Sequence, residues 1–241
     1  MSPRVRLGLF GVSAAVLACL FVWALTGLPQ FGAFQGEYGR ILNSAAGPER
    51  HVTNVVSAVT FDYRGFDTLG EEVLLFTAVM AVALLLREAR SGDERRADAV
   101  RSDVVRAVGL FAVGPTVVMG LYVAAHGYLT PGGGFQGGVA TASGLVLLYA
   151  AGRYRAYRAA SPKTLIDFAE GTGVGTYVVV GLAGIVVGGS AFLENVVELG
   201  VKGTLASGGT IAILNAVSGL AVASACVLIF HEFLEELMTA K

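Results

Sequence analysis

Charged side chains are scarce in this sequence, and their scarcity excludes several classes of protein. Only 15% of the 241 residues are Asp, Glu, Lys or Arg, whereas a soluble globular chain carries about 25%. The formal net charge of −1 leaves no basic excess for binding nucleic acid. Hydrophobic residues make up 54% of the chain. They stand in long uninterrupted runs, which indicates that lipid surrounds much of the protein.

Cysteine is almost absent as well. Cys19 and Cys226 each lie inside an apolar run without a close Cys or His partner. This favours buried or lipid-facing thiols over a disulfide or a metal site. The sequence also lacks a phosphate-binding loop, a nucleophile–base pair and metal-ligand spacing. We therefore expect no catalysis by this chain, no cofactor and no bound metal.

Six apolar segments are long enough to cross or nearly cross a membrane core of about 30 Å, at about 1.5 Å per helical residue. They predict an all-α integral membrane protein with an N-terminal two-helix unit and a C-terminal four-helix bundle. The first segment follows two arginines and imitates a signal peptide, but its length favours a retained helix. The predicted helices cover 7–27, 69–87, 107–125, 135–152, 173–193 and 209–231.

The positions of the basic residues predict an orientation. Thirteen of the 17 Lys and Arg residues fall on one side of the predicted crossings. Because basic loops stay in the cytoplasm, both termini are expected there. The thirteen are Arg4, Arg6, Arg87, Arg90, Arg95, Arg96, Arg101, Arg106, Arg153, Arg155, Arg158, Lys163 and Lys241, and the other four are Arg40, Arg50, Arg64 and Lys202.

One long charged segment divides the chain. Residues 87–106 read REARSGDERRADAVRSDVVR, a composition typical of a solvated linker. The expected organisation is a two-helix unit at 1–90, a cytoplasmic linker at 91–106 and a four-helix domain at 107–241.

The second apolar segment is too short without two carboxylates. Its uncharged part, Val73 to Leu86, covers only about 21 Å, so a spanning helix must extend back through Glu71 and Glu72. A carboxylate at that depth is costly unless it has a partner. Adjacent side chains point about 100° apart on a helix, so one should face protein and the other water. We expect Glu71 to be the functional carboxylate.

The predicted outer loop, 29–67, ends in a charged cluster. Asp62, Arg64 and Asp67 precede the two glutamates, and Arg64 could pair with an Asp. The cluster forms either part of an ion path or a fixed network of ion pairs. Within the same loop, valines at 52, 55, 56 and 59 have the spacing of a short amphipathic helix.

A glycine-rich stretch joins the third and fourth predicted helices. Its glycines recur four residues apart, which allows another helix to approach closely. A second interpretation is a broken helix start whose backbone groups face an ion path. His126, just before it, could titrate or could be an ordinary loop histidine. The residues of this motif are Pro131, Gly132, Gly133, Gly134, Phe135, Gly137 and Gly138.

These residues carry a resemblance to a known family. The string HGYLTPGGGFQGGV at 126–139 resembles the hallmark of the MnhB family, the B-type subunits of the Mrp-type Na⁺/H⁺ antiporters. The likeness extends from about 103 to 238. Residues 54–87, with DYRGFDTLGE at 62–71, are similar to the C-terminal end of the large A-type subunits of the same complexes. The chain looks like an MnhB protein with the last helix pair of an A-type protein in front.

The resemblance implies a membrane subunit of a multisubunit Na⁺/H⁺ antiporter in the cell membrane. Its expected partners are large proton-pumping-type subunits, small membrane subunits and the lipid bilayer, with Na⁺ and H⁺ as transported ions. The family's matching acid falls on Glu71. Relatives have a Phe-Asp pair where this chain has Leu214 and Asn215, so no acidic role is expected in the last helix.

The last four predicted helices contain no Asp, Glu, Lys or Arg. Since ion exchangers need such groups at mid-membrane, the chain is expected to line or brace an ion path and not to exchange ions alone. Two alternatives remain: a membrane-arm subunit of a related redox complex, such as a membrane-bound hydrogenase, and a purely structural assembly subunit.

Overall fold

The computed structural model describes residues 3–28, 36–89 and 102–239. Within these ranges the chain is helical, and its only extended pairing is an isolated bridge between Gly200 and Ser207. The chain forms two compact units, Met1–Arg40 and Ile41–Lys241, which are described separately.

The first unit contains helix α1 (Pro3–Thr26) and the start of α2 (Glu37–Arg50). Helix α1 is apolar on every side, and side chains such as Phe10, Phe21 and Trp23 are exposed. A helix without a polar face is typical of a membrane span.

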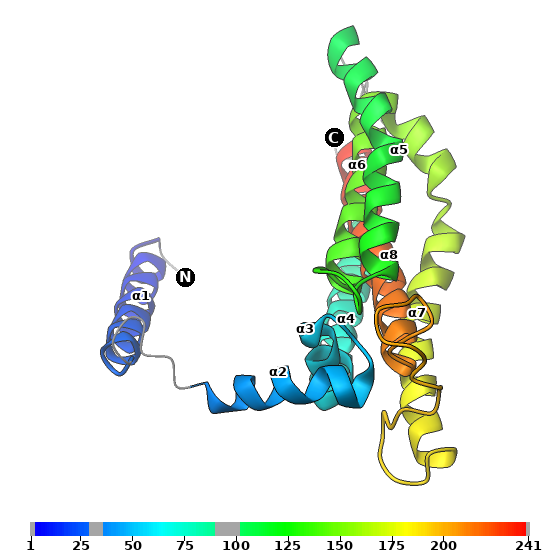
Figure 1. The fold of residues 1–241 in the computed structure, drawn as a ribbon. Coiled ribbons are helices and arrows are strands. Elements are labelled where there is room, and N and C mark those ends of the chain that lie inside the picture. The colour runs from blue at the N-terminus through cyan, green and yellow to red at the C-terminus, as the bar shows by residue number, and fades with distance from the viewer. Residues whose placement is uncertain (1–2, 29–35, 90–101, 240–241) are drawn as a thin grey trace. The chain divides into compact units, whose positions relative to one another are not determined.

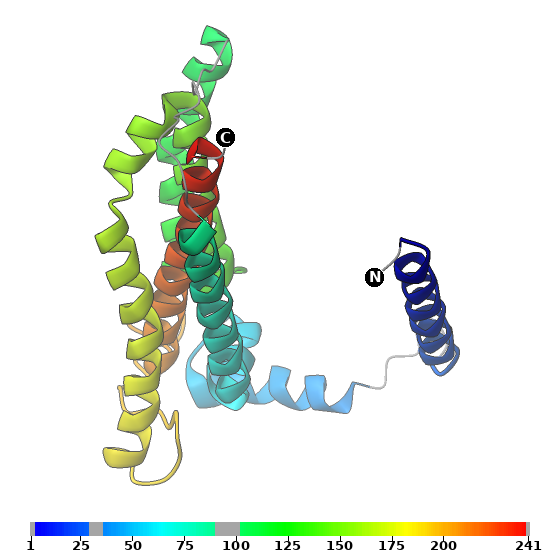
Figure 2. The ribbon, with the colours of Figure 1, turned by 180° about the vertical axis from the view of Figure 1, so that it is seen from behind.

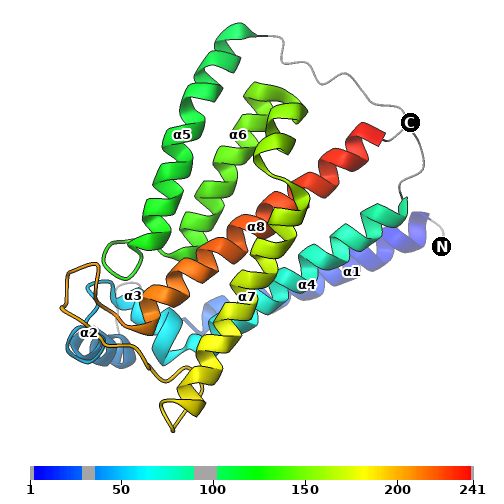
Figure 3. The same ribbon diagram turned by 90° about the vertical axis from the view of Figure 1, so that its right-hand side faces the viewer.

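Five long helices build the second unit, and they lie side by side (Figures 1 and 3). They are α4 (Gly65–Ala89), α5 (Asp103–Ala125), α6 (Gly134–Ala160), α7 (Lys163–Val186) and α8 (Thr210–Thr239). Together with Leu7–Thr26, the described residues contain six helices long and apolar enough to cross a membrane. The predicted all-α membrane fold is confirmed.

Helix α8 forms the centre of the second unit. It contacts α4, α5, α6 and α7, and α4 and α7 lie beside it in Figure 2. More than half of its spanning window, 56%, is buried inside the chain, against 33% or less for the other spans. Small residues permit this crowding: a Cβ added at Gly173 of α7 would lie 2.8 Å from the Ala221 Cβ of α8.

Short helices connect α2 to α4. Asn54 caps α3 (Val55–Ala58) by accepting a hydrogen bond from the Val56 amide at 3.1 Å, and a π-helical turn η1 (Val59–Tyr63) follows. The predicted amphipathic helix is therefore present only in part. Val52 precedes α3 and is buried, whereas Val56 is 68% exposed, so the valines do not share one face.

Helix α7 corrects the sequence prediction most strongly. It begins at Lys163, ten residues before the predicted start at 173, and it includes Asp167 and Glu170. The prediction that the last four spans are free of charge is therefore wrong. An uncharged stretch does not reveal this start, because a spanning helix can hold a carboxylate that faces protein.

Helices α6 and α8 extend well past their predicted ends. Helix α6 continues past residue 152 through a break at Arg153, where φ is 69° and ψ is 172°, and ends at Ala160. Helix α8 continues from its predicted end at 231 to Thr239.

Most of the predicted linker at 91–106 lies outside the described residues. Its last part forms the first turn of α5, where the Ser102 hydroxyl accepts a hydrogen bond from the Val105 amide at 3.4 Å. The division into 1–90, 91–106 and 107–241 stays a prediction.

Candidate functional site

The glycine motif packs the start of α6 between α5 and α8. A Cβ at Gly137 would lie 2.6 Å from both the Ala124 Cβ and the Gly120 carbonyl oxygen of α5. A Cβ at Gly138 would lie 2.7 Å from the Gly219 carbonyl oxygen of α8. Both distances are shorter than a van der Waals contact, so these glycines allow the close helix approach expected of them.

Asn215 connects the glycine motif to α8. Its Oδ1 accepts a hydrogen bond from the Gly134 amide at 3.2 Å, and its Nδ2 donates to Ser57 Oγ at 2.6 Å and to the Ile211 carbonyl at 3.0 Å. The Asn215 side chain is fully buried. The amide at the start of α6 is thus satisfied by a neutral group, at the position where the resemblance would place an acid.

A pocket of about 220 Å³ brings the two sequence motifs together. We call it the glycine pocket, and the end of the second unit where it lies the pocket end. Polar and apolar residues both line it. Its wall consists of Val56, Ser57, Thr60, Phe61, Glu71, Gly132, Gly133, Gly134, Phe135, Gln136 and Asn215.

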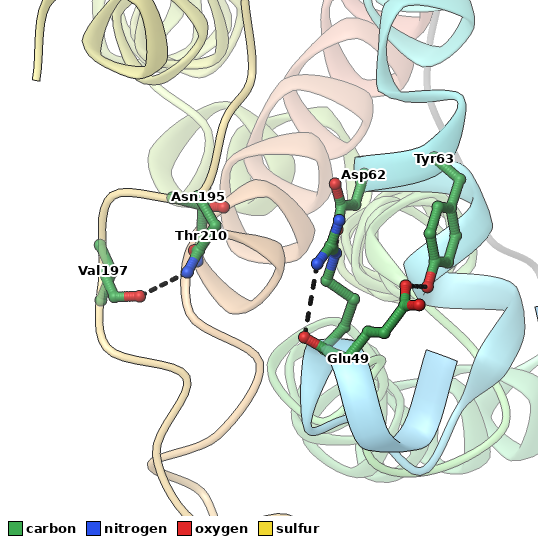
Figure 4. A network of polar contacts seen from close by, with 7 residues as sticks. Glu49, Asp62, Tyr63, Asn195, Val197 and Thr210 are labelled. Carbon is green, nitrogen blue, oxygen red and sulfur yellow. Dashed lines mark hydrogen bonds and ion pairs between the residues drawn. The ribbon is translucent and has the colours of Figure 1, made fainter. Parts of the chain in front are cut away.

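Asp62, labelled in Figure 4 together with Glu49 and Tyr63, pairs with Arg50 of α2, and not with Arg64 as one sequence interpretation allowed. Burial raises the pKa of Asp62, and the Arg50 guanidinium only partly offsets that effect. The Tyr63 hydroxyl donates to Glu49 Oε2 at 2.7 Å. Burial and this hydrogen bond raise the pKa of Tyr63 to about 12. These contacts connect α2 to η1, and we call Glu49, Arg50, Asp62 and Tyr63 the fixed network.

The other predicted charged residues make local contacts. Arg64 Nε donates to Asp67 Oδ2 at 2.6 Å, as expected for an Arg–Asp pair, and both side chains are exposed. The His126 ring stacks on Tyr122 with centroids 4.1 Å apart, and its Nδ1 lies 3.1 Å from the Tyr122 carbonyl oxygen. His126 is therefore held by its own helix, α5.

The two adjacent glutamates of α4 face opposite environments, as predicted. Glu71 is exposed at the edge of the glycine pocket, whereas Glu72 is only 1% exposed. The enclosed carboxylate of this pair is thus Glu72, and the expectation that Glu71 is the functional carboxylate stays a prediction. Glu72 shares with Thr68 and Val79 the face of α4 that packs on α8, because these positions recur at helical spacing.

Polar groups surround Glu72 without satisfying it. Ser218 of α8 faces its carboxylate without forming a hydrogen bond, and Tyr177 of α7 lies nearby. The Tyr177 hydroxyl donates to the Gly65 carbonyl at 2.9 Å instead. Neither Glu72 oxygen has a hydrogen-bond partner in the described part of the chain. An ionised carboxylate enclosed in this way costs several kcal/mol unless a cation or a proton accompanies it.

A second enclosed carboxylate, Glu170, was missed by sequence reasoning. Its side chain is 1% exposed on α7, and its Oε1 has no hydrogen-bond partner among the described residues. A signal was present in the sequence. The buried positions of α7 are Glu170, Gly173, Tyr177, Gly181 and Gly184, which follow the three- and four-residue spacing of a packed helix face.

The opposite end of the second unit, which we call the Lys163 end, holds another buried polar group. Lys163 Nζ pairs with Glu232 Oε1, whose side chain is fully buried. The neighbouring His231 is 1% exposed, and its Nε2 lies 2.9 Å from the Ser161 carbonyl oxygen. Its Nδ1 has no hydrogen-bond partner in the described ranges. The break at Arg153 turns the chain so that Tyr157 covers this ring, with centroids 4.9 Å apart.

Carboxylates enclosed between spanning helices are typical of membrane proteins that move ions. Comparison with known sequences agrees with this class. Residues 104–228 match the family described as a domain related to the MnhB subunit of Na⁺/H⁺ antiporter, and the chain belongs to this family. Residues 9–102 match the MbhE family, described as the E-type component of MBH.

Two solved structures share the fold. A chain of the membrane-bound sulfane sulfur reductase (MBS), an archaeal respiratory membrane complex, is 30% identical with a TM-score of 0.75, and the match covers 95% of this chain and 98% of that one. A chain of the Mrp complex from Dietzia sp. DQ12-45-1b is 28% identical with a TM-score of 0.71. That match covers 96% of this chain and 26% of the other.

Two curated proteins are also similar. A probable A/B-type component of a K⁺/H⁺ antiporter from Rhizobium meliloti (strain 1021) is 32% identical over 126 residues, which cover 43% of this chain. An uncharacterized protein of Methanocaldococcus jannaschii is 29% identical over 168 residues, which cover 61% of this chain. The matches span 13% of the first relative and 62% of the second.

Proposed function

We propose that this chain is a membrane subunit of a multisubunit cation/proton antiporter. It works beside large proton-pumping-type subunits and small membrane subunits, with Na⁺ and H⁺ as the transported ions. It lines or braces the ion path and neither exchanges ions alone nor catalyses a reaction. The observation that carries this proposal is the enclosed Glu72 carboxylate, which has no hydrogen-bond partner within the described chain.

The burial of Glu72 favours a transport role over a purely structural one. A structural carboxylate gains stability through ion pairs and hydrogen bonds, and neither oxygen of Glu72 makes a hydrogen bond among the described residues. A group that exchanges a cation or a proton must instead remain available to it. A role in transport then explains why the chain bears the free-energy cost of burying the Glu72 carboxylate.

The glycine pocket is the proposed approach to Glu72. Asn215 forms part of the pocket wall, and Ser218, which faces Glu72, lies one turn further along α8. Glu71 stands at the pocket with its charge accessible. We assign it the role of attracting cations to the path.

The remaining sequence candidates keep supporting roles in this proposal. Asp62, Arg64 and Asp67 follow directly after the pocket-lining Phe61. They are proposed to set the charge around the entrance, and His126 is proposed to belong to the same ion path.

Two isosteric substitutions test the proposal in the assembled complex. Glu72→Gln removes the enclosed charge and is expected to abolish sodium-driven proton movement in vesicles while assembly is preserved. Glu71→Gln removes the accessible charge and is expected to slow transport at low sodium concentration. Normal transport by an assembled Glu72→Gln complex would support a purely structural role instead.

We also propose that both termini lie in the cytoplasm of a cell whose plasma membrane holds the complex, as the basic residues suggest. Cysteines placed at Glu198, near the pocket end, and at Arg158, near the Lys163 end, are both exposed. In a background without Cys19 and Cys226, an impermeant reagent should label only position 198 in intact cells. Labelling of position 158 alone would show that the orientation is the opposite of the proposed one.

The two family matches support a composite origin for the chain. Their boundaries, 9–102 and 104–228, meet inside the predicted linker. We infer that 1–90 and 107–241 correspond to two subunits that are separate in some relatives. Co-expression of 1–102 and 103–241 as two chains should then restore transport, whereas two inactive halves would argue for one indivisible unit.

A second candidate function is a membrane-arm component of a redox complex. The match to the MBS chain favours it, because it covers nearly the whole of both chains. Purification of the native complex and identification of its subunits separates the two candidates. Iron–sulfur or flavin subunits would support the redox complex, and their absence from an active preparation would support the antiporter.

A further inference from the structure

Three enclosed titratable groups lie on or beside helix α8. Glu72 of α4 lies beside Ser218, near the pocket end of α8. Gly173 of α7 meets Ala221, and Lys163 of α7 pairs with Glu232. Because α7 and α8 run antiparallel, these two contacts fix their register.

The register places Glu170 between the other two groups. Glu170 precedes Gly173 by three residues, so it lies near the level of Ser224 on α8. Six residues separate Ser218 from Ser224, which corresponds to about 9 Å along the helix. Seven more residues lead to His231, which adds about 10 Å. The three groups therefore follow one another along α8 at similar intervals.

Each of the three groups has an atom available for a proton. Both oxygens of Glu72, Oε1 of Glu170 and Nδ1 of His231 have no hydrogen-bond partner in the part of the chain that is described. His231 Nε2 lies 2.9 Å from a carbonyl oxygen, so Nε2 carries the hydrogen of the neutral ring. Nδ1 is then a free proton acceptor.

The surroundings favour a proton over a metal cation. A dehydrated metal cation needs several oxygen or nitrogen ligands. Among the described residues no three His, Cys, Asp or Glu side chains gather closely enough to hold one. Among the described residues, Glu71 acts on Glu72 and Asp167 acts on Glu170. The Lys163–Glu232 pair follows His231 in the fold, and the Tyr157 ring packs on it.

We propose that Glu170 and His231 are two proton-binding positions that extend the path from Glu72 to the Lys163 end. The protonated Glu170 carboxyl releases its proton through intervening water to His231 Nδ1. This leaves a carboxylate and an imidazolium, and the imidazolium then gives the proton to the aqueous side. The same steps in reverse carry a proton from the Lys163 end along α8 towards Glu72. This inference rests on the proposed transport function and adds the ligand and the route.

The test uses the whole complex in vesicles. Glu170→Gln and His231→Gln should each reduce sodium-driven proton movement roughly tenfold or more, because a required proton acceptor is missing. Asp167→Asn is the matched control, since Asp167 is an exposed acid one turn away on the same helix. It should transport within about twofold of the unsubstituted complex.

A second readout separates proton binding from a structural effect. Acidification should produce a protonated-carboxyl band in the infrared difference spectrum of the complex. Part of that band should be missing in Glu170→Gln and present in Asp167→Asn. If Glu170→Gln prevents assembly, Glu170→Asp should assemble and shift the same band, and an unshifted band would overturn the proposal.

The outcomes distinguish this inference from the proposed function. Full transport by both Glu170→Gln and His231→Gln, together with loss in Glu72→Gln, would overturn the route and leave the transport function standing. Full transport by all three variants would overturn both. Loss in all three with normal transport by Asp167→Asn supports both.

Discussion

Asn215 and Glu72 are both buried against the same stretch of α8, yet their side chains differ completely in hydrogen bonding. Asn215 makes three hydrogen bonds, to the start of α6, to Ser57 of α3 and to its own helix. Glu72 makes none within the described residues. Ser218, one turn from Asn215 on α8, nevertheless faces the Glu72 carboxylate. The neutral Asn215 side chain links helices through hydrogen bonds, whereas the acidic Glu72 side chain is buried without such bonds among the described residues.

This difference separates two kinds of buried polar residue. A satisfied group contributes to stability when its partners would otherwise be left unpaired. An unsatisfied acid lowers stability and persists only where function requires it. Substitutions at the two kinds of position should therefore change stability in opposite directions.

The largest effect is expected at the helix contacts that hold Asn215 in place. Gly137→Leu forces a side chain into the α5 backbone and should cost about 3 kcal/mol or more, so that the complex fails to assemble. Gly134→Leu should act in the same way against α8. Gly114→Leu is the control, because no atom lies within 4 Å of a Cβ there. Size-exclusion chromatography of the complex measures the result, and normal assembly of Gly137→Leu would show that this contact is not close.

The buried ion pair at the Lys163 end should come next. Lys163→Met removes the cation that accompanies the fully buried Glu232 and is expected to lower stability by about 3 kcal/mol. Adding Glu232→Gln should recover part of the loss, because the buried carboxylate that has lost the Lys163 ammonium is then replaced by a neutral amide. Denaturant unfolding of the purified complex tests this, and equal stability of the single and double variants would contradict it.

Asn215→Leu is expected to lower stability by about 2 kcal/mol. It leaves the Gly134 amide and the Ser57 hydroxyl without their buried partner. The same unfolding measurement applies, and an unchanged midpoint would mean that water replaces the amide.

Glu72→Gln should have the opposite sign, with a gain of about 1 kcal/mol or no loss, because a neutral amide is easier to bury than a carboxylate. The comparison of Asn215 with Glu72 fails if this variant is less stable than the unsubstituted complex. Glu71→Gln serves as the exposed control on the neighbouring position.

The smallest effect concerns Tyr63 in the fixed network. The pKa of Tyr63 is raised from its usual value near 10 to about 12, so folding favours the protonated phenol. Its stabilising contribution is complete below about pH 10 and is lost as the pH rises through about 12. Tyr63→Phe should lower stability by about 0.5 kcal/mol near pH 7, and the difference should vanish near pH 12. Tyr38→Phe, at an exposed position, is the control for the substitution itself.

The spanning helices could be predicted because long apolar runs need no knowledge of packing. The start of α7 could not be found by the same means. Lys163 and Glu170 place charge inside a helix, and they become acceptable only when α8 supplies Glu232 and an enclosing surface. The sequence does not show which helix will face which.

The sequence predicted several residues of the candidate site but not how they are arranged. Glu71 and the glycine motif were both named, and the structure joins them in one pocket. The sequence left open which of Glu71 and Glu72 turns inward, since neighbouring residues differ by about 100° and only the α8 contact decides between them. Arg50 was absent from the predicted cluster because α2 was not predicted as a helix.

The length of α8 gives these groups different depths in a membrane. Its 30 residues extend about 45 Å, half as long again as a hydrocarbon core of about 30 Å. With the pocket end of α8 near one surface, Glu72 and Glu170 fall in the hydrocarbon region, whereas Glu232 lies about 33 Å along the axis, close to the opposite headgroups. The Lys163–Glu232 pair would then mark the boundary at which lipid gives way to phosphate and water.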